Sequence, residues 1–323
     1  PPYFYIRDNQ AVSPPTDTIE ARNTKGWSNI QGEFWRAGGI APGLELQDVL
    51  PRFTDEAIHV IQRHEKKSSD QPLFLYLAYP APHTPWLPAK QFHGKSGAGM
   101  YGEFTMMVDH MIGRVLSALE KANMADDTLV IFSSDNGPVW YEEDVARFGH
   151  DSSGGLRGMK ADAWECGHRM PLIVRWPGRV PAGSVHKRLV CLTDFLATFA
   201  ELVGVELSKG AGPDSISFYK TLMGQSEPDR PTLVIKCGNG AMTAREGPWK
   251  LITQLGSGGF SEPKRVKPTP GGPVGQLYNL DDDIGEIHNL YAQKPEVVAR
   301  LSRELKRIER SGSSRPVHHE KEK

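Results

Sequence analysis

Two short apolar runs on either side of a long amphipathic segment constrain the fold of this chain most. The runs are "PLFLYLAY" at residues 72–79 and "TLVIFSS" at residues 128–134. Between Phe104 and Leu119 the apolar residues recur at every third or fourth position, which predicts a helix with one buried face. Short runs that are apolar at successive positions are typical of strands covered on both faces. With a third run at residues 170–176, the pattern predicts an α/β domain whose mostly parallel sheet is sandwiched by helices.

The pattern changes after about residue 225. Short apolar segments such as "PTLVIKC" and "GQLYNL" alternate with stretches rich in Gly and Pro, which is typical of antiparallel strands. A last helix carries its apolar residues on one face. We therefore predict an α/β domain over residues 1–225 and a smaller antiparallel subdomain with a terminal helix over residues 226–312. Residues 313–323, polar and charged, are predicted to be a disordered tail.

Composition excludes several classes of function. The 323 residues include 38 Lys and Arg against 39 Asp and Glu, so the net charge of -1 provides no general attraction for nucleic acid or an anionic membrane. No apolar run reaches the ~20 residues that cross a bilayer, and we predict no transmembrane segment. The three cysteines have no CxxC spacing and support neither a disulfide scaffold nor a zinc site, so we interpret them as buried or incidental thiols. The chain starts without Met, and we expect it to be an internal part of a longer reading frame. Oligomeric state is left open.

The pair Asp135 and Asn136 directly follows the second apolar run. Asn-Gly is also common in tight hairpin turns, so a turn without a ligand is one interpretation. The alternative is a metal site, because a carboxylate beside a carboxamide suits Ca²⁺, which takes about six to eight oxygen ligands. In proteins with a parallel sheet, ligands bind in the crevice outside the carboxyl ends of the strands. Asp135 and Asn136 are expected at such an end.

Two other stretches carry polar groups with possible chemistry. "PAPHTP" holds His83 between prolines that stiffen the loop, although a surface or capping role is the simpler interpretation for this residue alone. "GGLRGMK" combines flexible glycines with Arg157 and Lys160. Lys160 could bind a tetrahedral oxyanion as a point charge, and Arg157 could do the same or form a structural ion pair. A solvated basic loop is the competing interpretation.

The order of these motifs resembles the sulfatase family of the alkaline phosphatase superfamily, and arylsulfatases in particular. The stretches "PHTP", "SDNGP", "LRGMK" and "HRMPLIVRWPG" occur in the family's order, and "LYNLDDDIGEIHNL" is similar to its carboxyl-terminal signature. The resemblance covers roughly residues 50–310. Several motifs in one order are more specific than any of them alone.

The resemblance implies a role for each candidate residue. Asp135 and Asn136 match half of the metal site that holds a Ca²⁺. His83 matches the histidine that contacts the sulfate ester and protonates its leaving oxygen, and Lys160 matches the lysine that binds the sulfate oxygens. The implied substrate is a small-molecule or carbohydrate sulfate ester. His150 is a further candidate for the pocket, with a structural role as the alternative.

The family's nucleophile is a formylglycine made from the first residue of a Cys/Ser-x-Pro/Ala-x-Arg motif near the amino terminus. Cys166, Cys191 and Cys237 all fail this pattern, and we expect no nucleophile in this chain. The nucleophile and the other metal ligands are expected upstream, so the segment alone should be inactive. The resemblance suggests a secreted, periplasmic or lysosomal location. Two alternatives stay open, namely a phosphoesterase or phosphonate hydrolase of the same superfamily and a catalytically dead binding protein.

Overall fold

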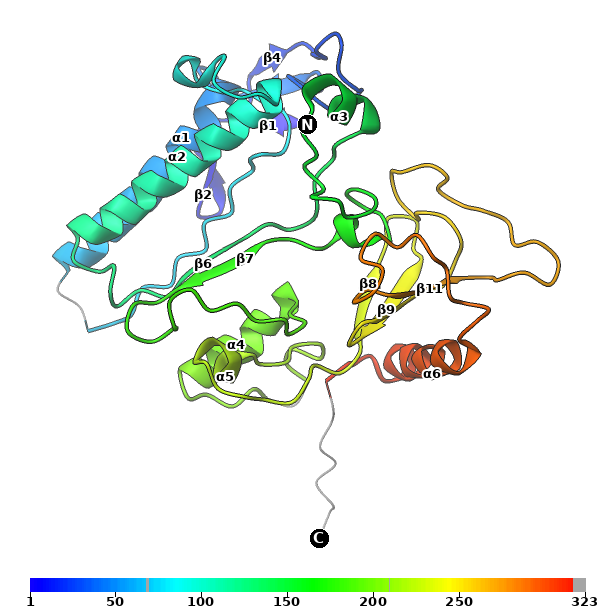
Figure 1. Ribbon diagram of the computed structural model, residues 1–323. Coiled ribbons are helices and arrows are strands. Elements are labelled where there is room, and N and C mark those ends of the chain that lie inside the picture. The colour runs from blue at the N-terminus through cyan, green and yellow to red at the C-terminus, as the bar shows by residue number, and fades with distance from the viewer. Residues whose placement is uncertain (68–69, 209, 316–323) are drawn as a thin grey trace. The chain divides into compact units, whose positions relative to one another are not determined.

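A computed structural model describes residues 1–67, 70–208 and 210–315 (Figure 1). The chain forms two compact units. The first comprises Pro1–Thr128 with Glu143–His150, and the second comprises Leu129–Glu142 with the chain from Asp151 onward. The predicted domain boundary at residue 225 stays a prediction, and each unit is described by itself below.

The first unit is built on two long helices that pack side by side, α1 (Val49–Lys66) and α2 (Gly99–Lys121) (Figure 1). The apolar period predicted a helix over Phe104–Leu119, and α2 confirms it. Thr54 lies buried inside α1, where its hydroxyl donates to the Leu50 carbonyl at 2.9 Å.

Short strands and turns complete the first unit. The strands β1 and β5 pair parallel, β4 and β5 pair antiparallel, and β2 and β3 form a hairpin. Their bounds are β1 Pro2–Tyr3, β2 Ile6–Arg7, β3 Gln10–Ala11, β4 Asp17–Ile19 and β5 Gly38–Ile40, followed by the 3-10 turns Leu46–Asp48 and Lys90–Phe92 and by α3 (Glu142–Phe148). Trp27 contacts both Trp86 and Phe148, with ring centroids 5.0 and 5.5 Å apart. These rings connect α3 to the segment that follows His83.

The apolar runs form less sheet than the sequence predicts. Strands β6 (Val130–Ser133) and β7 (Leu172–Arg175) pair with each other, but antiparallel rather than parallel. Residues 72–79 form no strand, and Phe74 and Tyr76 are 76% and 82% exposed. A strand needs a neighbouring strand to pair with, and none of the strands that the structure describes pairs with this run. The expected parallel central sheet is thus not formed by the described residues.

The second unit contains a four-stranded antiparallel sheet whose order is β11-β10-β9-β8. Its strands are β8 Leu233–Lys236, β9 Met242–Glu246, β10 Trp249–Ile252 and β11 Gln276–Asn279. Helix α6 (Pro295–Ser311) covers one face of this sheet, where Leu301 and Leu305 pack against Leu251 and Leu277. The predicted carboxyl-terminal sheet and helix are confirmed.

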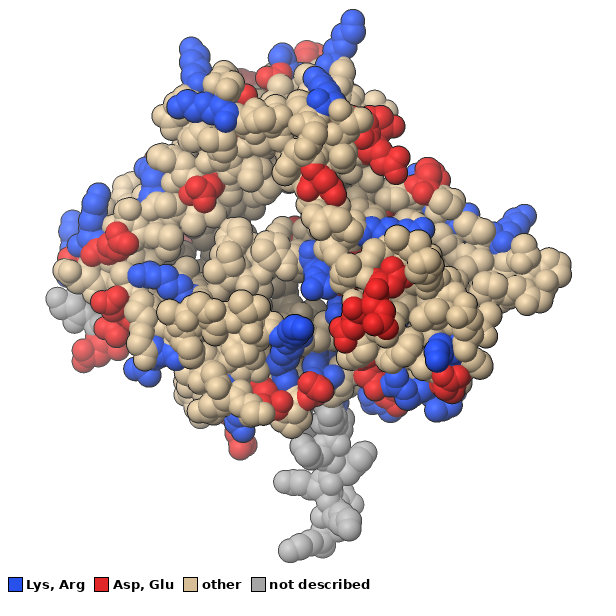
Figure 2. Space-filling model, viewed as in Figure 1, with Lys and Arg blue, Asp and Glu red and all other residues tan. Residues whose placement is uncertain are grey.

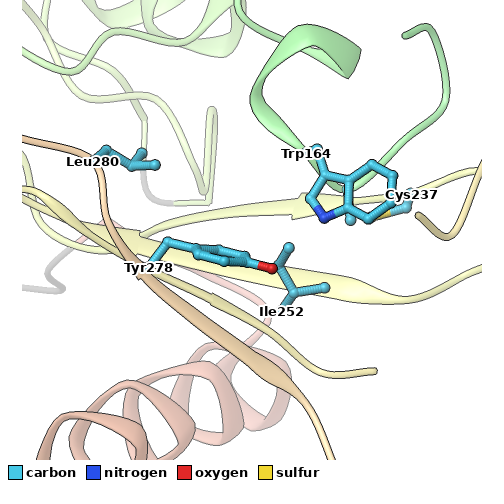
Figure 3. Close-up of a cluster of buried hydrophobic side chains, with 6 residues drawn as sticks. Trp164, Cys237, Ile252, Tyr278 and Leu280 are labelled. Atoms are coloured by element: carbon cyan, nitrogen blue, oxygen red, sulfur yellow. The ribbon is translucent and has the colours of Figure 1, made fainter. Parts of the chain in front are cut away.

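The opposite face of this sheet is covered by the loop that follows Lys160. Trp164 packs against Cys237, Ile252 and Tyr278, and Figure 3 shows Trp164 and α6 on opposite sides of the strands. The sequence alternation within each strand explains this arrangement, since neighbouring residues such as Leu251 and Ile252 point to opposite faces. The carboxyl-terminal sheet therefore has one face covered by α6 and the other covered by the loop that follows Lys160.

The remaining elements are short. They are the 3-10 turns Glu165–Gly167 and Leu192–Asp194 and the helices α4 (Phe195–Leu202) and α5 (Tyr219–Leu222). Gly204 follows α4 with a φ of 69°, a left-handed conformation that glycine adopts readily at the end of a helix.

The first three residues of the predicted tail make hydrogen bonds. Residues 313–315 are ordered, because the Ser313 hydroxyl donates to the Pro213 carbonyl at 2.6 Å and the Ser314 N–H donates to the Asp214 carboxylate at 2.9 Å. The rest of the predicted disordered tail, residues 316–323, lies outside the described residues.

The surface is mixed in charge. Figure 2 shows Lys and Arg interspersed with Asp and Glu on the visible face, as the net charge of -1 leads us to expect. Among the described residues, no helix combines the length and apolar character that a membrane span requires.

Candidate functional site

The loop that carries Asp135 and Asn136 leaves β6 at its carboxyl end. Asp135 is exposed and Asn136 is half-buried. The Asn136 side-chain amide donates to the Gly137 carbonyl at 2.9 Å, and the Ser134 hydroxyl donates to the Asn136 carbonyl at 3.2 Å. The partner of β6 is β7, far along the chain, so this loop is not the tip of a hairpin.

Gly137 brings this loop against the turn at residues 166–167. Its N–H donates to the Gly167 carbonyl at 3.2 Å. A Cβ at residue 137 would lie 1.6 Å from the Cys166 carbonyl oxygen, a distance that no side chain can occupy. Glycine is therefore required here for close packing of two backbones.

Lys160 is hydrogen-bonded to the loop that carries Asp135 and Asn136. Its backbone N–H donates to the Pro138 carbonyl at 2.8 Å, and its side chain is half-buried. The loop with the predicted metal ligands Asp135 and Asn136 and the loop with the predicted sulfate ligand Lys160 are thus hydrogen-bonded to each other.

Asp162 fixes the backbone just beyond Lys160. This buried carboxylate accepts hydrogen bonds from the Met159 N–H at 2.8 Å, the Phe260 N–H at 2.6 Å, and the N–H and hydroxyl of Ser261 at 3.1 and 2.5 Å. A carboxylate with several donors is well satisfied despite its burial. Asp162 could not be identified from the sequence, because its partners Phe260 and Ser261 lie about a hundred residues away.

A buried ion cluster lies on the face of the sheet that the Lys160 loop covers. The Lys250 ammonium lies 3.0 Å from Glu165 and 2.9 Å from Glu286, and Arg245 lies 2.9 Å from Glu165. Burial raises the pKa of Glu165, but the bond from His168 and the charges of Lys250 and Arg245 outweigh it and hold this pKa well below its usual range. Burial raises the pKa of Glu286, against the opposing charge of Lys250.

Arg157 contacts this cluster through Glu286. Its guanidinium donates to the Glu286 carbonyl and lies over the Trp164 ring, 3.8 Å from the centroid. These contacts are structural, but they are not the ion pair expected from the sequence. Arg157 therefore anchors the start of the loop whose centre is Lys160.

His83 and His150 lie in the other compact unit. His83 is exposed, and its Nδ1 lies 2.9 Å from the Thr84 carbonyl oxygen. The loop is held by Trp86, which is buried and whose indole N–H donates to the Pro82 carbonyl at 2.9 Å. The catalytic role of His83 and the substrate-binding role of His150 stay predictions.

His168 is mainly buried and lies next to Glu165, with 3.5 Å between its Nε2 and the carboxylate. Burial and the Lys250 charge lower the pKa of His168, although Glu165 opposes the shift. Two cysteines are buried as well, and burial raises the pKa of Cys166 and Cys237 to about 11. These groups are part of the packing around the loop.

One stretch does carry the letters of the nucleophile motif, which corrects the expectation that the chain holds no match. It is the serine version, Ser226-Glu-Pro-Asp-Arg230. Arg230 is buried, and its guanidinium lies 2.8 Å from the Asp194 carboxylate, while Glu227 accepts a hydrogen bond from the Thr221 N–H at 2.7 Å. The stretch connects α5 to β8 and has a structural role.

The Sulfatase family model matches residues 23–205, more than half of the chain. The chain belongs to the sulfatase family. Its sequence is 32% identical over 290 residues to the N-acetylgalactosamine-6-O-sulfatase of Bacteroides thetaiotaomicron, covering 85% of this chain and 53% of that protein. It is 30% identical over 280 residues to arylsulfatase A of Bos taurus, covering 83% and 52%.

Solved structures agree with this assignment. A structure from Bacteroides thetaiotaomicron, described under the metabolism of multiple glycosaminoglycans, matches with a TM-score of 0.74 at 32% identity and covers 84% of this chain and 56% of that one. The fold is therefore the sulfatase α/β fold. The chain spans about half the length of the curated relatives it matches.

The predicted metal ligands fit part of a calcium site. Asp135 and Asn136 offer only oxygen ligands at a loop that projects from the end of β6, and hard cations such as Ca²⁺ prefer such ligands. Two residues supply fewer than the about six to eight oxygens that Ca²⁺ takes. In the part of the chain that the structure describes, no group of three or more His, Cys, Asp or Glu is arranged to hold a metal.

Proposed function

We propose that the protein is a calcium-dependent sulfatase that hydrolyses sulfate monoesters of a sugar. The observation that carries this proposal is the hydrogen bond between the Lys160 N–H and the Pro138 carbonyl, which joins two loops of opposite chemistry. One loop offers oxygen ligands for a cation, and the other offers an ammonium group for an anion. This combination suits the cleavage of an ester whose leaving oxygen gains negative charge in the transition state.

Each residue has a separate task in the proposed reaction. Lys160 neutralises charge on the sulfuryl oxygens. Asp135 and Asn136 hold part of the calcium shell, and calcium when bound would withdraw further charge from the same group. His83 supplies the proton that the departing oxygen needs, as a general acid does. The nucleophile, a formylglycine, is expected from a part of the protein outside this chain, and the segment alone is expected to be inactive.

The proposed substrate class is a sulfated sugar, and an amino-sugar 6-sulfate is the first candidate. The name of the Bacteroides relative, N-acetylgalactosamine-6-O-sulfatase, supports this choice. The near-zero net charge excludes a general attraction for long polyanions, so recognition has to be local.

The test uses the full-length protein, coexpressed with a formylglycine-generating enzyme and supplied with calcium. We expect it to release sulfate from N-acetylgalactosamine 6-sulfate and from 4-nitrophenyl sulfate, and to turn over 4-nitrophenyl phosphate far more slowly. Lys160→Met should lower kcat/KM by about 10²–10³-fold, because a positioned charge on the reacting group is lost. Lys187→Met, at an exposed position of the same unit, is the matched control and should have no effect.

Three results would count against the proposal. Preferential turnover of the phosphate ester favours the phosphoesterase alternative. A mature, folded protein without any turnover favours a catalytically dead descendant. Equal activity of Lys160→Met and Lys187→Met removes Lys160 from the site.

A further inference from the structure

The segment from Arg157 to Glu165, which contains Lys160, is held at both ends by one residue of the carboxyl-terminal part. At the first end, the Arg157 guanidinium donates to the main-chain carbonyl of Glu286. At the second end, the Glu165 N–H donates to the Glu286 carboxylate at 2.5 Å. Glu286 thus closes a loop with Lys160 near its centre.

The carboxylate of Glu286 is fixed in turn by the sheet. Its other oxygen lies 2.9 Å from the ammonium of Lys250 on β10, which also lies 3.0 Å from the Glu165 carboxylate. Glu165 and Glu286 are 0% exposed and Lys250 is 1% exposed. Water screens groups buried to this degree only little, so the attraction between these charges is strong.

The middle of the segment is held by packing and by hydrogen bonds. Trp164 lies against Tyr278 and Ile252 of the sheet, as Figure 3 shows, and Asp162 is held by the backbone of Phe260 and Ser261. The Lys160 N–H is bonded to Pro138 on the side of the predicted metal ligands. A change at Glu286 would therefore reach Lys160 through the backbone.

We propose that Glu286 is a positioning residue for the sulfatase reaction, which holds Lys160 at the sulfuryl group by fixing both ends of its loop. This inference rests on the proposed function. Glu286 touches no reacting atom and acts through Arg157 and Glu165. A displacement of about 1 Å at a group that contacts the reacting atoms can cost about 100-fold in rate.

The first test compares two variants in the full-length, calcium-loaded protein. Glu286→Ala removes the acceptor of the Glu165 N–H and should lower kcat/KM for N-acetylgalactosamine 6-sulfate by about 100-fold. KM should rise as well, because Lys160 binds the sulfate group, whereas a smaller folded fraction would lower kcat at constant KM. Glu286→Gln keeps an acceptor oxygen and should recover most of the loss. Glu309→Ala, an exposed glutamate on α6, is the control.

The second test is a double-mutant cycle with Lys160→Met. If Glu286 acts through Lys160, then Glu286→Ala should cause less than about a threefold further loss once Lys160 is gone. A loss of the same factor in both backgrounds overturns the inference, since it shows that the two residues act independently. Unchanged KM in both Glu286 variants also overturns it.

A third measurement does not depend on turnover. The Lys160 amide should exchange its hydrogen at least about tenfold faster in Glu286→Ala than in the unsubstituted protein, because the loop opens more readily. Equal exchange rates contradict the inference. Absence of sulfatase activity in the unsubstituted protein, together with the expected faster exchange of the Lys160 amide in Glu286→Ala, is a failure of the proposed function and leaves no reaction for Glu286 to serve.

Discussion

Substitution of Gly137 tests the packing that joins the two site loops. In Gly137→Ala the new Cβ would lie 1.6 Å from the Cys166 carbonyl oxygen and 2.8 Å from its carbon. Both atoms belong to the main chain, so no rotation of a side chain can relieve the clash. The loops have to separate, which weakens the bonds from Gly137 to Gly167 and from Lys160 to Pro138.

The cost can be worked out from these contacts. Forcing an extra carbon into a close-packed position costs about 1–3 kcal/mol. Each weakened hydrogen bond adds about 0.5–1.5 kcal/mol at most. A loss of about 3 kcal/mol in the free energy of unfolding follows, which for a domain of this size corresponds to a drop of about 6–12 °C in Tm.

Urea denaturation followed by tryptophan fluorescence measures this loss. Gly113→Ala is the matched control, because Gly113 lies within α2 with no atom within 4 Å of a new Cβ. The control should be stabilised by about 0.5–1 kcal/mol, since alanine favours helix more than glycine does. A loss below about 1 kcal/mol for Gly137→Ala would refute the close approach of the two loops.

Three further outcomes are expected. Leu301→Ala should cost about 2–5 kcal/mol in thermal unfolding, because Leu301 is fully buried between α6 and the sheet, while the exposed Arg303→Ala should cost almost nothing. Lys250→Met should cost about 3–5 kcal/mol at neutral pH, because the buried Glu286 carboxylate loses the ammonium beside it and Glu165 loses one of its cationic partners; equal stability in urea would contradict this. The lowered pKa of His168 means that the unfolded ring gains a proton below about pH 6.5 while the folded ring resists it, so stability falls as pH falls below that value. Urea midpoints between pH 5 and 7 should therefore depend less on pH in His168→Gln than in the unsubstituted protein, and an unchanged slope would refute this role.

Elements whose apolar residues recur at a regular spacing could be predicted from the sequence. Helix α2 and helix α6 follow from the spacing of their apolar residues, and the carboxyl-terminal strands follow from short apolar segments between turns. The direction of β6 relative to β7 could not be predicted, because pairing joins residues about forty positions apart and leaves no local pattern. The run at residues 72–79 has strand-like residues but no neighbouring strand among the described residues.

Some residues of the candidate site could likewise be predicted from the sequence, and others could not. Asp135, Asn136 and Lys160 were predicted from motifs that lie at the ends of predicted elements. Their supports, Asp162 and Glu286, were not identified, because Asp162 meets Phe260 and Glu286 meets Glu165 across about a hundred residues of sequence. A buried charge pair has no periodic signature, and only the fold shows which carboxylate meets which lysine.

The central claim is that the loop of Asp135 and the loop of Lys160 form one sulfatase site. Its most direct test is the initial rate of sulfate release from N-acetylgalactosamine 6-sulfate by the full-length, formylglycine-bearing protein, with and without Asp135→Ala, over a range of calcium concentrations. We predict a rate at least about 100-fold lower in the variant at low calcium, with partial recovery as calcium is raised. A variant as active as the unsubstituted protein at every calcium concentration would contradict the claim.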